Sequence, residues 1–181
     1  IEDGPRINSM TLLDSFSPGD TESASRGQLA HPMNIAHLKQ LEKRLYQVGE
    51  KAYCFVGNGL SNQSFIEGPE GLIVIDTGES VEEMEAALKA VRKVSKSPVA
   101  ACFYSHFHYV SGTRALLDEG NVTDIPIYGH AGIPENIARF GGEVAPRVSR
   151  GLVHQFGLKL PNEGKDGLVH AGLGRFFRNP E

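Results

Sequence analysis

Residues 71–80 have the sequence Gly-Leu-Ile-Val-Ile-Asp-Thr-Gly-Glu-Ser, and this stretch decides the fold. The four apolar residues after the glycine predict a strand that is covered on both faces. Asp76 comes directly after that strand. Ser80 then caps a helix expected over 81–95, and Glu83 completes a capping box with it. The stretch therefore predicts a strand, a loop and a helix in immediate succession.

The sequence on both sides of this stretch favours an α/β (α+β) fold. The predicted helix over 81–95 would bury a stripe of apolar residues at helical spacing, namely Met84, Leu88, Val91 and Val94. The other expected elements are a helix over 37–46 that Gly49 ends, strands at 52–56 and 61–66, a hairpin turn at 68–71, a covered strand at 99–104, short helices at 112–117 and 134–138, and an edge strand at 125–128.

Two polar segments follow the two covered strands. The first is 76–78, and the second is 105–108, with the sequence Ser-His-Phe-His. Ligand sites of open sheets lie beyond the carboxyl ends of the strands. We therefore expect these two segments to meet and to form the functional site.

Composition excludes several classes of function. The 181 residues carry a formal net charge of −4, which argues against a nucleic-acid partner. No apolar run approaches the ~20 residues of a membrane span, and the first residues do not resemble a signal peptide. The two cysteines lie in apolar runs, so no disulfide framework is expected. A reducing, cytoplasmic setting fits these features.

Three regions can be expected along the chain. Residues 1–30 form an N-terminal arm, for which a docked segment and a loose tail are equally compatible with the sequence. Residues 31–150 form the main half-domain. Residues 151–181 are a Gly-rich C-terminal extension that we expect to be loop-like.

The pair His106 and His108 is the sharpest chemical feature. Two imidazoles at this spacing can converge on one metal ion if the loop turns there. Ordinary turn histidines would give the same pattern, so the residues alone leave both interpretations open.

Several motifs in order resemble the metallo-β-lactamase fold, and most of all its alkylsulfatase branch. They are residues 61–66, 71–78, 104–108, 134–137, 155–161 and 171–174, which together cover roughly 35–175. The resemblance implies an αββα sandwich, of which this chain carries the first half as a mixed sheet covered by helices. It also implies a hydrolase that uses zinc, with His106 and His108 as ligands.

The chain departs from the family pattern His-x-His-x-Asp-His at two positions. Val110 stands at the position of the Asp and Ser111 at that of the last His. Valine cannot bind a metal and serine is a poor zinc ligand, so we expect one zinc ion in place of two. A partner chain could share this ion. A half sheet would leave an apolar face and an edge uncovered. We therefore expect a second subunit that carries the other half, in a hetero-oligomer.

Other residues near the histidines are candidates for supporting roles. By the resemblance, Asp76 would orient the ligand loop, although a strand-end cap explains it equally well. Tyr109 and Ser111 could bind substrate or donate hydrogen bonds. Phe103, Phe107 and Tyr109 could line an aromatic pocket. Residues with weaker claims are Tyr104, His130, Arg139, Arg147 and Arg150.

Two functions remain open from the sequence. In the first, the chain is a subunit of a metal-dependent hydrolase that cleaves a small organic ester or ether by activating water. An alkyl sulfate is the substrate that the family implies. The half-domain length alone also resembles two-subunit hydrolases that demethylate dinitroanisole, so an activated aryl methyl ether is another option. In the second, the chain is a non-catalytic scaffold that stabilises an active homologous partner.

Overall fold

The computed structural model describes residues 20–172 and residue 174. These residues form two compact units. The smaller unit consists of 20–39 together with 160–169, and the larger one of 40–159 with 170–172 and 174. The three regions expected from the sequence are a different division of the chain, and they stay a prediction.

The smaller unit is built around a short hairpin. Strands β1 (Glu22–Ser23) and β2 (Leu29–Ala30) pair antiparallel, and helix α2 (Pro32–Gln40) follows. The side chain of Gln28 is fully buried and donates to the carbonyl oxygens of Asn162 (2.9 Å) and Leu168 (3.2 Å). The end of the expected N-terminal arm, 20–30, therefore forms this hairpin, while 1–19 lie outside the described residues.

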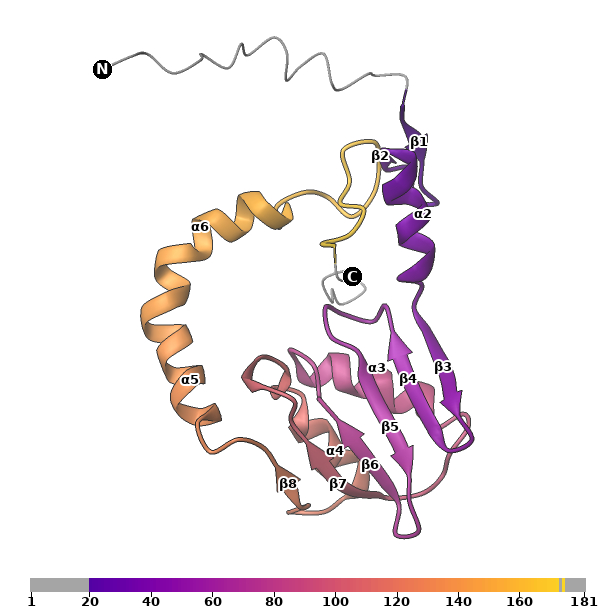
Figure 1. Ribbon diagram of the computed structural model, residues 1–181, viewed down its shortest axis with the longest axis vertical. Helices are drawn as coiled ribbons and strands as arrows, with labels where there is room; N and C mark the ends of the chain where they lie inside the picture. Colours follow the sequence, from indigo (N-terminus) through magenta and orange to yellow (C-terminus); the bar gives the residue numbers. More distant parts are fainter. Residues whose placement is uncertain (1–19, 173, 175–181) are drawn as a thin grey trace, which may run out of the picture. The chain divides into compact units, whose positions relative to one another are not determined.

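A six-stranded mixed sheet dominates the larger unit (Figure 1). Its strands lie in chain order: β3 (Arg44–Gly49), β4 (Ala52–Val56), β5 (Gln63–Glu67), β6 (Leu72–Ile75), β7 (Val99–Phe103) and β8 (Ile127–Tyr128). Neighbours are antiparallel from β3 to β6 and parallel from β6 to β8. The carboxyl ends of β6 and β7 therefore lie side by side, as the sequence predicted.

Two helices cover one face of this sheet, α3 (Val81–Val91) and α4 (Thr113–Gly120) (Figure 1). Between them and the strands lies the hydrophobic core, whose fully buried members include Phe65, Leu72, Val74, Met84, Ala87, Val91, Cys102 and Leu116. Burial, followed by the charge of Asp76, raises the pKa of the Cys102 thiol to about 12. This thiol is thus an inert core residue.

The opposite face of the sheet carries a second set of apolar side chains. The strand register places Ile75 beside Phe103 and Phe103 beside Tyr128 in one row, with Ile66 beside Ile73 in the next. Phe103 and Tyr128 stack with ring centroids 4.7 Å apart, yet they remain 41% and 53% exposed. Ile66 is 40% exposed. This open face, defined by Ile66, Ile73, Ile75, Phe103 and Tyr128, contributes nothing to the buried core.

The elements nearest the deciding stretch confirm the sequence predictions. Strand β6 has the predicted bounds, and the Gly68 N–H donates to the Gly71 carbonyl in the predicted hairpin turn (2.9 Å). Ser80 caps α3 by accepting a hydrogen bond from the Glu83 N–H (3.1 Å). The short helix expected over 134–138 is α5 (Ile133–Arg139), and β8 is the expected edge strand.

The helix predicted over 37–46 is wrong in its second half. Helix α2 ends at Gln40, and Arg44–Gly49 is strand β3. Leu45 pairs with Phe55 and packs against the core, while the next residue, Tyr46, faces the other way. The alternation of a strand replaces the helical period here because β4 offers hydrogen-bonding partners along most of this segment, which outweighs local helix propensity.

Two further expectations need correction. Helix α3 ends at Val91, so Val94 is 52% exposed and does not belong to the buried stripe. In the segment after the helix, the Arg92 guanidinium donates to the Ser97 carbonyl oxygen (2.7 Å). The segment after 150 is not all loop, because α6 (Ala145–Phe156) continues through Gly151. Among the helices of 20–172, none is long and apolar enough to cross a membrane.

Truncation of a side chain should lower the free energy of unfolding by different amounts on the two faces of the sheet. Leu72→Ala removes a fully buried side chain and should lower the free energy of unfolding by about 2–5 kcal/mol. Ile66→Ala, a residue of equal size on the open face, should cost much less. Urea unfolding of both variants measures this difference. Equal losses would mean that the open face is as well packed as the core.

Candidate functional site

The site begins where β6 and β7 end. Asp76 and Ser105 follow these neighbouring parallel strands, and the Asp76 carboxylate accepts hydrogen bonds from both the Ser105 N–H (2.8 Å) and the Ser105 hydroxyl (2.6 Å). The prediction that the two polar segments meet is therefore confirmed. The contact joins the ends of two strands that are separated in sequence by a whole helix.

Asp76 adopts an unusual backbone conformation. Its φ is +60°, in the left-handed region, and the residue is only 8% exposed. Aspartate tolerates this region better than most residues. The backbone N–H of Asp76 donates to the Phe103 carbonyl (2.9 Å), so main chain and side chain are both bonded to the end of β7.

Ser105 connects Asp76 to His106. The Ser105 hydroxyl lies 2.8 Å from His106 Nδ1. Because the hydroxyl proton is directed to the Asp76 carboxylate, its oxygen is left to accept the Nδ1–H of the imidazole. This arrangement selects the tautomer in which Nε2 carries a lone pair. An orienting partner on the second ring nitrogen is typical of histidines that bind metals.

His108 lies one short turn away on η1 (Phe107–Tyr109), a 3₁₀-helix. The ring centroids of His106 and His108 are 5.1 Å apart, and both residues are exposed. Partial burial, followed by the neighbouring His106, lowers the pKa of the His108 imidazole. At neutral pH this favours the neutral ring, the form that can bind a cation.

Aromatic rings surround the two histidines. Phe107 lies 3.9 Å from His108 between ring centroids, Tyr109 lies 4.9 Å from His106, and Phe140 lies 5.6 Å from His108. Phe140 begins η2 (Phe140–Val144), a π-helical turn after α5, and sequence reasoning missed it because it is distant in the chain. Phe103, which we also expected in this wall, stacks instead on Tyr128.

Tyr109 is held mainly by its backbone. Its carbonyl oxygen accepts from the Thr77 N–H (2.8 Å) and from the Thr77 hydroxyl (3.2 Å). Burial, and then the charges of nearby carboxylates, raise the pKa of the Tyr109 phenol. The phenol therefore keeps its proton at neutral pH and can serve as a hydrogen-bond donor.

Val110 and Ser111 occupy the positions where the family pattern has metal ligands. Val110 forms a parallel bridge with Gly78, and the Ser111 N–H donates to the Gly78 carbonyl (3.2 Å). Ser111 is exposed and lies two residues after η1, which we call the histidine turn. Within 20–172 and 174, no three His, Cys, Asp or Glu side chains are grouped so that they could hold a metal ion.

The remaining sequence candidates have other surroundings. Tyr104 packs against the core and shares a hydrogen bond with the Thr113 hydroxyl. His130 is exposed, and its Nδ1 accepts from the Gly132 N–H (3.0 Å). Arg139 lies 3.6 Å from Glu143 in an exposed ion pair. Arg147 and Arg150 are exposed on α6.

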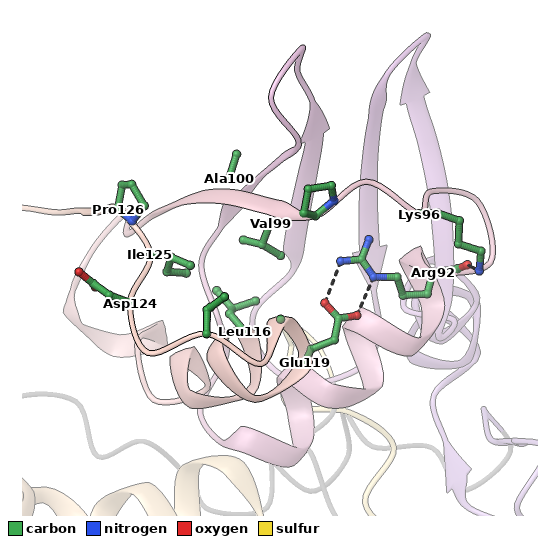
Figure 2. Close-up of a pocket in the computed structure, with 12 residues that line it drawn as sticks. Arg92, Lys96, Val99, Ala100, Leu116, Glu119, Asp124, Ile125 and Pro126 are labelled. Carbon is green, nitrogen blue, oxygen red and sulfur yellow. Dashed lines mark hydrogen bonds and ion pairs between the residues drawn. The ribbon is translucent and has the colours of Figure 1, made fainter.

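A hollow of about 510 Å³ lies at the other end of β7 (Figure 2). Its floor includes Val99, the first residue of that strand, whereas His106 follows the last. Arg92 and Glu119 are paired across it through two hydrogen bonds of 2.6 and 2.8 Å, which engage both charges. The hollow is thus separate from the histidine site, and two of its charged side chains, Arg92 and Glu119, bind each other.

Fold and site together define one half of a sandwich with a histidine pair at the carboxyl edge of its sheet. The family model of the metallo-beta-lactamase superfamily matches residues 56–174. The chain therefore belongs to this superfamily, whose members typically bind metal, often zinc.

Individual relatives are alkylsulfatases, which are hydrolases. The chain is 37% identical to a linear primary-alkylsulfatase from Pseudomonas over 60% of its own length and 21% of that protein. It is 30% identical to an (R)-specific secondary-alkylsulfatase from Pseudomonas over 90% of its length and 24% of that protein. A structure of a double mutant of the sec-alkyl sulfatase PisA1 matches 86% of this chain and 25% of that one, with 26% identity and a TM-score of 0.70. The chain thus spans about a quarter of the length of these relatives.

The hydrogen-bonded series of Asp76, Ser105 and His106 can be tested by its effect on the His106 tautomer. Ser105→Ala removes the acceptor of the Nδ1–H, so the imidazole should become a mixture of both neutral tautomers. Imidazole ¹⁵N chemical shifts at mildly alkaline pH measure this change. Ser111→Ala, in the same loop, is the control and should leave the His106 signals in place. A single unchanged tautomer in Ser105→Ala would contradict the assignment.

Proposed function

We propose that this chain supplies part of the metal site of a hydrolase that cleaves small sulfate esters. His106 and His108 would hold one zinc ion. The other ligands would come from protein beyond the described residues, and a second subunit that carries the other half of the fold is the source we favour. The supporting observation is the contact of Asp76 with Ser105 and of Ser105 with His106.

The residues fit a zinc ion as part of a donor set. Catalytic zinc is commonly held by three protein ligands of the N or O type. Two neighbouring imidazoles provide two of these, and the Nδ1 contact leaves Nε2 of His106 as a donor. Neither Val110 nor Ser111 adds a good ligand, which favours one ion over two.

The other site residues have roles toward the substrate in this proposal. A bound divalent cation supplies Lewis acidity, which lowers the pKa of water beside it. Asp76 holds the histidine loop through Ser105. The protonated phenol of Tyr109 and the hydroxyl of Ser111 are hydrogen-bond donors for the oxygens of an anionic ester. Phe107 and Phe140 provide apolar surface for its organic group.

The names of the relatives support the proposed substrate class. Alkylsulfatases are named for sulfate esters with an alkyl group, and an aromatic wall beside the histidines suits the organic part of such an ester. An activated aryl methyl ether, such as a nitroanisole, is the other substrate that we propose to screen, because electron-poor rings stack on aromatic side chains.

A partner is proposed because the sheet has an open apolar face. Phe103, Tyr128 and Ile66 are each at least 40% exposed on the side that α3 and α4 do not cover. In a sandwich, such a face packs against a second sheet about 10 Å away. The same partner would bring further metal ligands to the edge where the histidines lie.

The alternative function is a scaffold without catalysis. A degenerate copy of the fold would carry a residue such as Val110 in place of a metal ligand. The histidine pair would then be a remnant of a lost metal site. In that case the partner alone would show full activity and a complete metal site. The enzyme proposal requires that activity depends on this chain.

Substituting the two histidines separates these functions. In the chain purified with its partner, His106→Ala and His108→Ala should each lower the zinc content and reduce turnover of an alkyl sulfate to background. His154→Ala removes an exposed histidine on α6, for which we propose no role, and should change neither. Metal analysis and sulfate release are the measurements. Unchanged metal and turnover in both site variants would exclude the proposed metal site and favour the scaffold.

The open face can be tested through association. Phe103→Lys places a charge on this face and should abolish the complex with the partner in native mass spectrometry, since burying an unpaired charge is costly. Val94→Lys alters an apolar residue of comparable exposure at the end of α3 and should leave the complex intact. Circular dichroism confirms that both variants are folded. A complex that survives Phe103→Lys would place the interface elsewhere.

A further inference from the structure

Glu83 is a fully buried carboxylate on α3 with a complete set of hydrogen-bond donors around it. Its Oε1 accepts from the side-chain amide of Gln63 (2.8 Å) and from the Ser61 hydroxyl (3.2 Å). Its Oε2 accepts from the backbone N–H of Glu79 (2.9 Å). One carboxylate thus joins the segment before β5 to the loop that follows β6.

The Glu83 carboxylate makes contacts that helix capping does not require. In a capping box the glutamate side chain returns to the N–H of the N-cap residue, which here is Ser80. The Glu83 side chain instead reaches past it to the N–H of Glu79. The predicted capping box is therefore present only in its Ser80 half. The Glu83 side chain goes to Glu79 instead, and it also binds the side chains of Ser61 and Gln63 at the start of β5.

Two glycines provide the space that the carboxylate occupies. A Cβ at Gly59 would lie 2.5 Å from Glu83 Oε1, and one at Gly78 would lie 2.6 Å from its Cδ. Both distances are shorter than real Cβ atoms show. Gly78 also has a φ of +76°. The backbone at Gly78 therefore rests directly on the Glu83 carboxylate, and movement of one requires movement of the other.

The same loop holds the residues that follow His108. Thr77 donates to the Tyr109 carbonyl through its N–H (2.8 Å), and the Gly78 carbonyl accepts the Ser111 N–H (3.2 Å). Asp76, directly before them, holds Ser105. The loop 76–79 therefore contacts the histidine turn on both sides of His106 and His108, while its own far end rests on Glu83.

We infer that Glu83 is a positioning residue for the histidine site, acting through the loop 76–79. It touches neither histidine. It fixes the loop whose hydrogen bonds set the place of Ser105 on one side of the pair and of Tyr109 on the other. The inference rests on the proposed function for its effect on metal binding, but its effect on the histidines themselves is independent of any metal.

The test compares Glu83→Gln with Glu82→Gln in the whole chain. Both remove one negative charge from α3, but Glu82 is exposed. In Glu83→Gln an amide NH₂ replaces an oxygen that faces donors, so the loop must shift. We expect the imidazole ¹⁵N signals of His106 and His108 to move, and the affinity for Zn²⁺ added alone to fall about tenfold or more. Glu82→Gln should match the wild type in both measurements.

The inference is overturned if Glu83→Gln lowers only the unfolding temperature and leaves the imidazole signals and Zn²⁺ affinity as in the wild type. If the wild-type chain alone does not bind Zn²⁺, the imidazole signals alone decide the role of Glu83. The proposed metal site itself is wrong only if the chain purified with its partner also lacks zinc. Should Glu83→Gln not fold, Ser61→Ala removes a single donor to the carboxylate and should move the same signals by a smaller amount. Unmoved signals there would equally overturn the inference.

Discussion

The Asp76 carboxylate accepts two hydrogen bonds from Ser105, and this contact determines how the ends of β6 and β7 are arranged. Parallel pairing brings the two strand ends together but does not by itself direct the loops that leave them. The carboxylate holds the start of the second loop, and the Ser105 hydroxyl then reaches His106. The left-handed backbone at Asp76 is tolerated because both its main chain and its side chain are bonded to the neighbouring strand.

The sequence predicted the region around this contact well because several local signals agree there. A run of four apolar residues, a polar loop and a capped helix have one consistent arrangement, and the structure has it. The adjacency of Asp76 and Ser105 followed from the general rule for the edges of open sheets. These features depend on short stretches of sequence, so a single amino-acid sequence was enough to predict them.

The expectations that failed depend on contacts between distant residues. Leu45 lies at helical spacing from Leu38 and Leu41, and only the hairpin with β4 makes 44–49 a strand. Phe140 lies close to His108 because a π-helical turn follows α5. No local sequence pattern predicted this turn. Glu83 was recognisable as a capping residue, but its contact with Gln63 needs the fold of two separate segments. In each case tertiary structure decides between local alternatives of similar free energy.

The proposed partner would give two features that look unrelated one physical explanation. The histidine turn offers two good metal donors with Val110 at a third position, and the sheet leaves Phe103 and Tyr128 exposed on its open face. Either feature alone could arise from simple divergence. However, the open face belongs to the same sheet whose carboxyl edge carries the histidines, so a second sheet laid against that face would bring its own loops to that edge. Burial of the open apolar surface would then supply the free energy that holds the two halves of the metal site together.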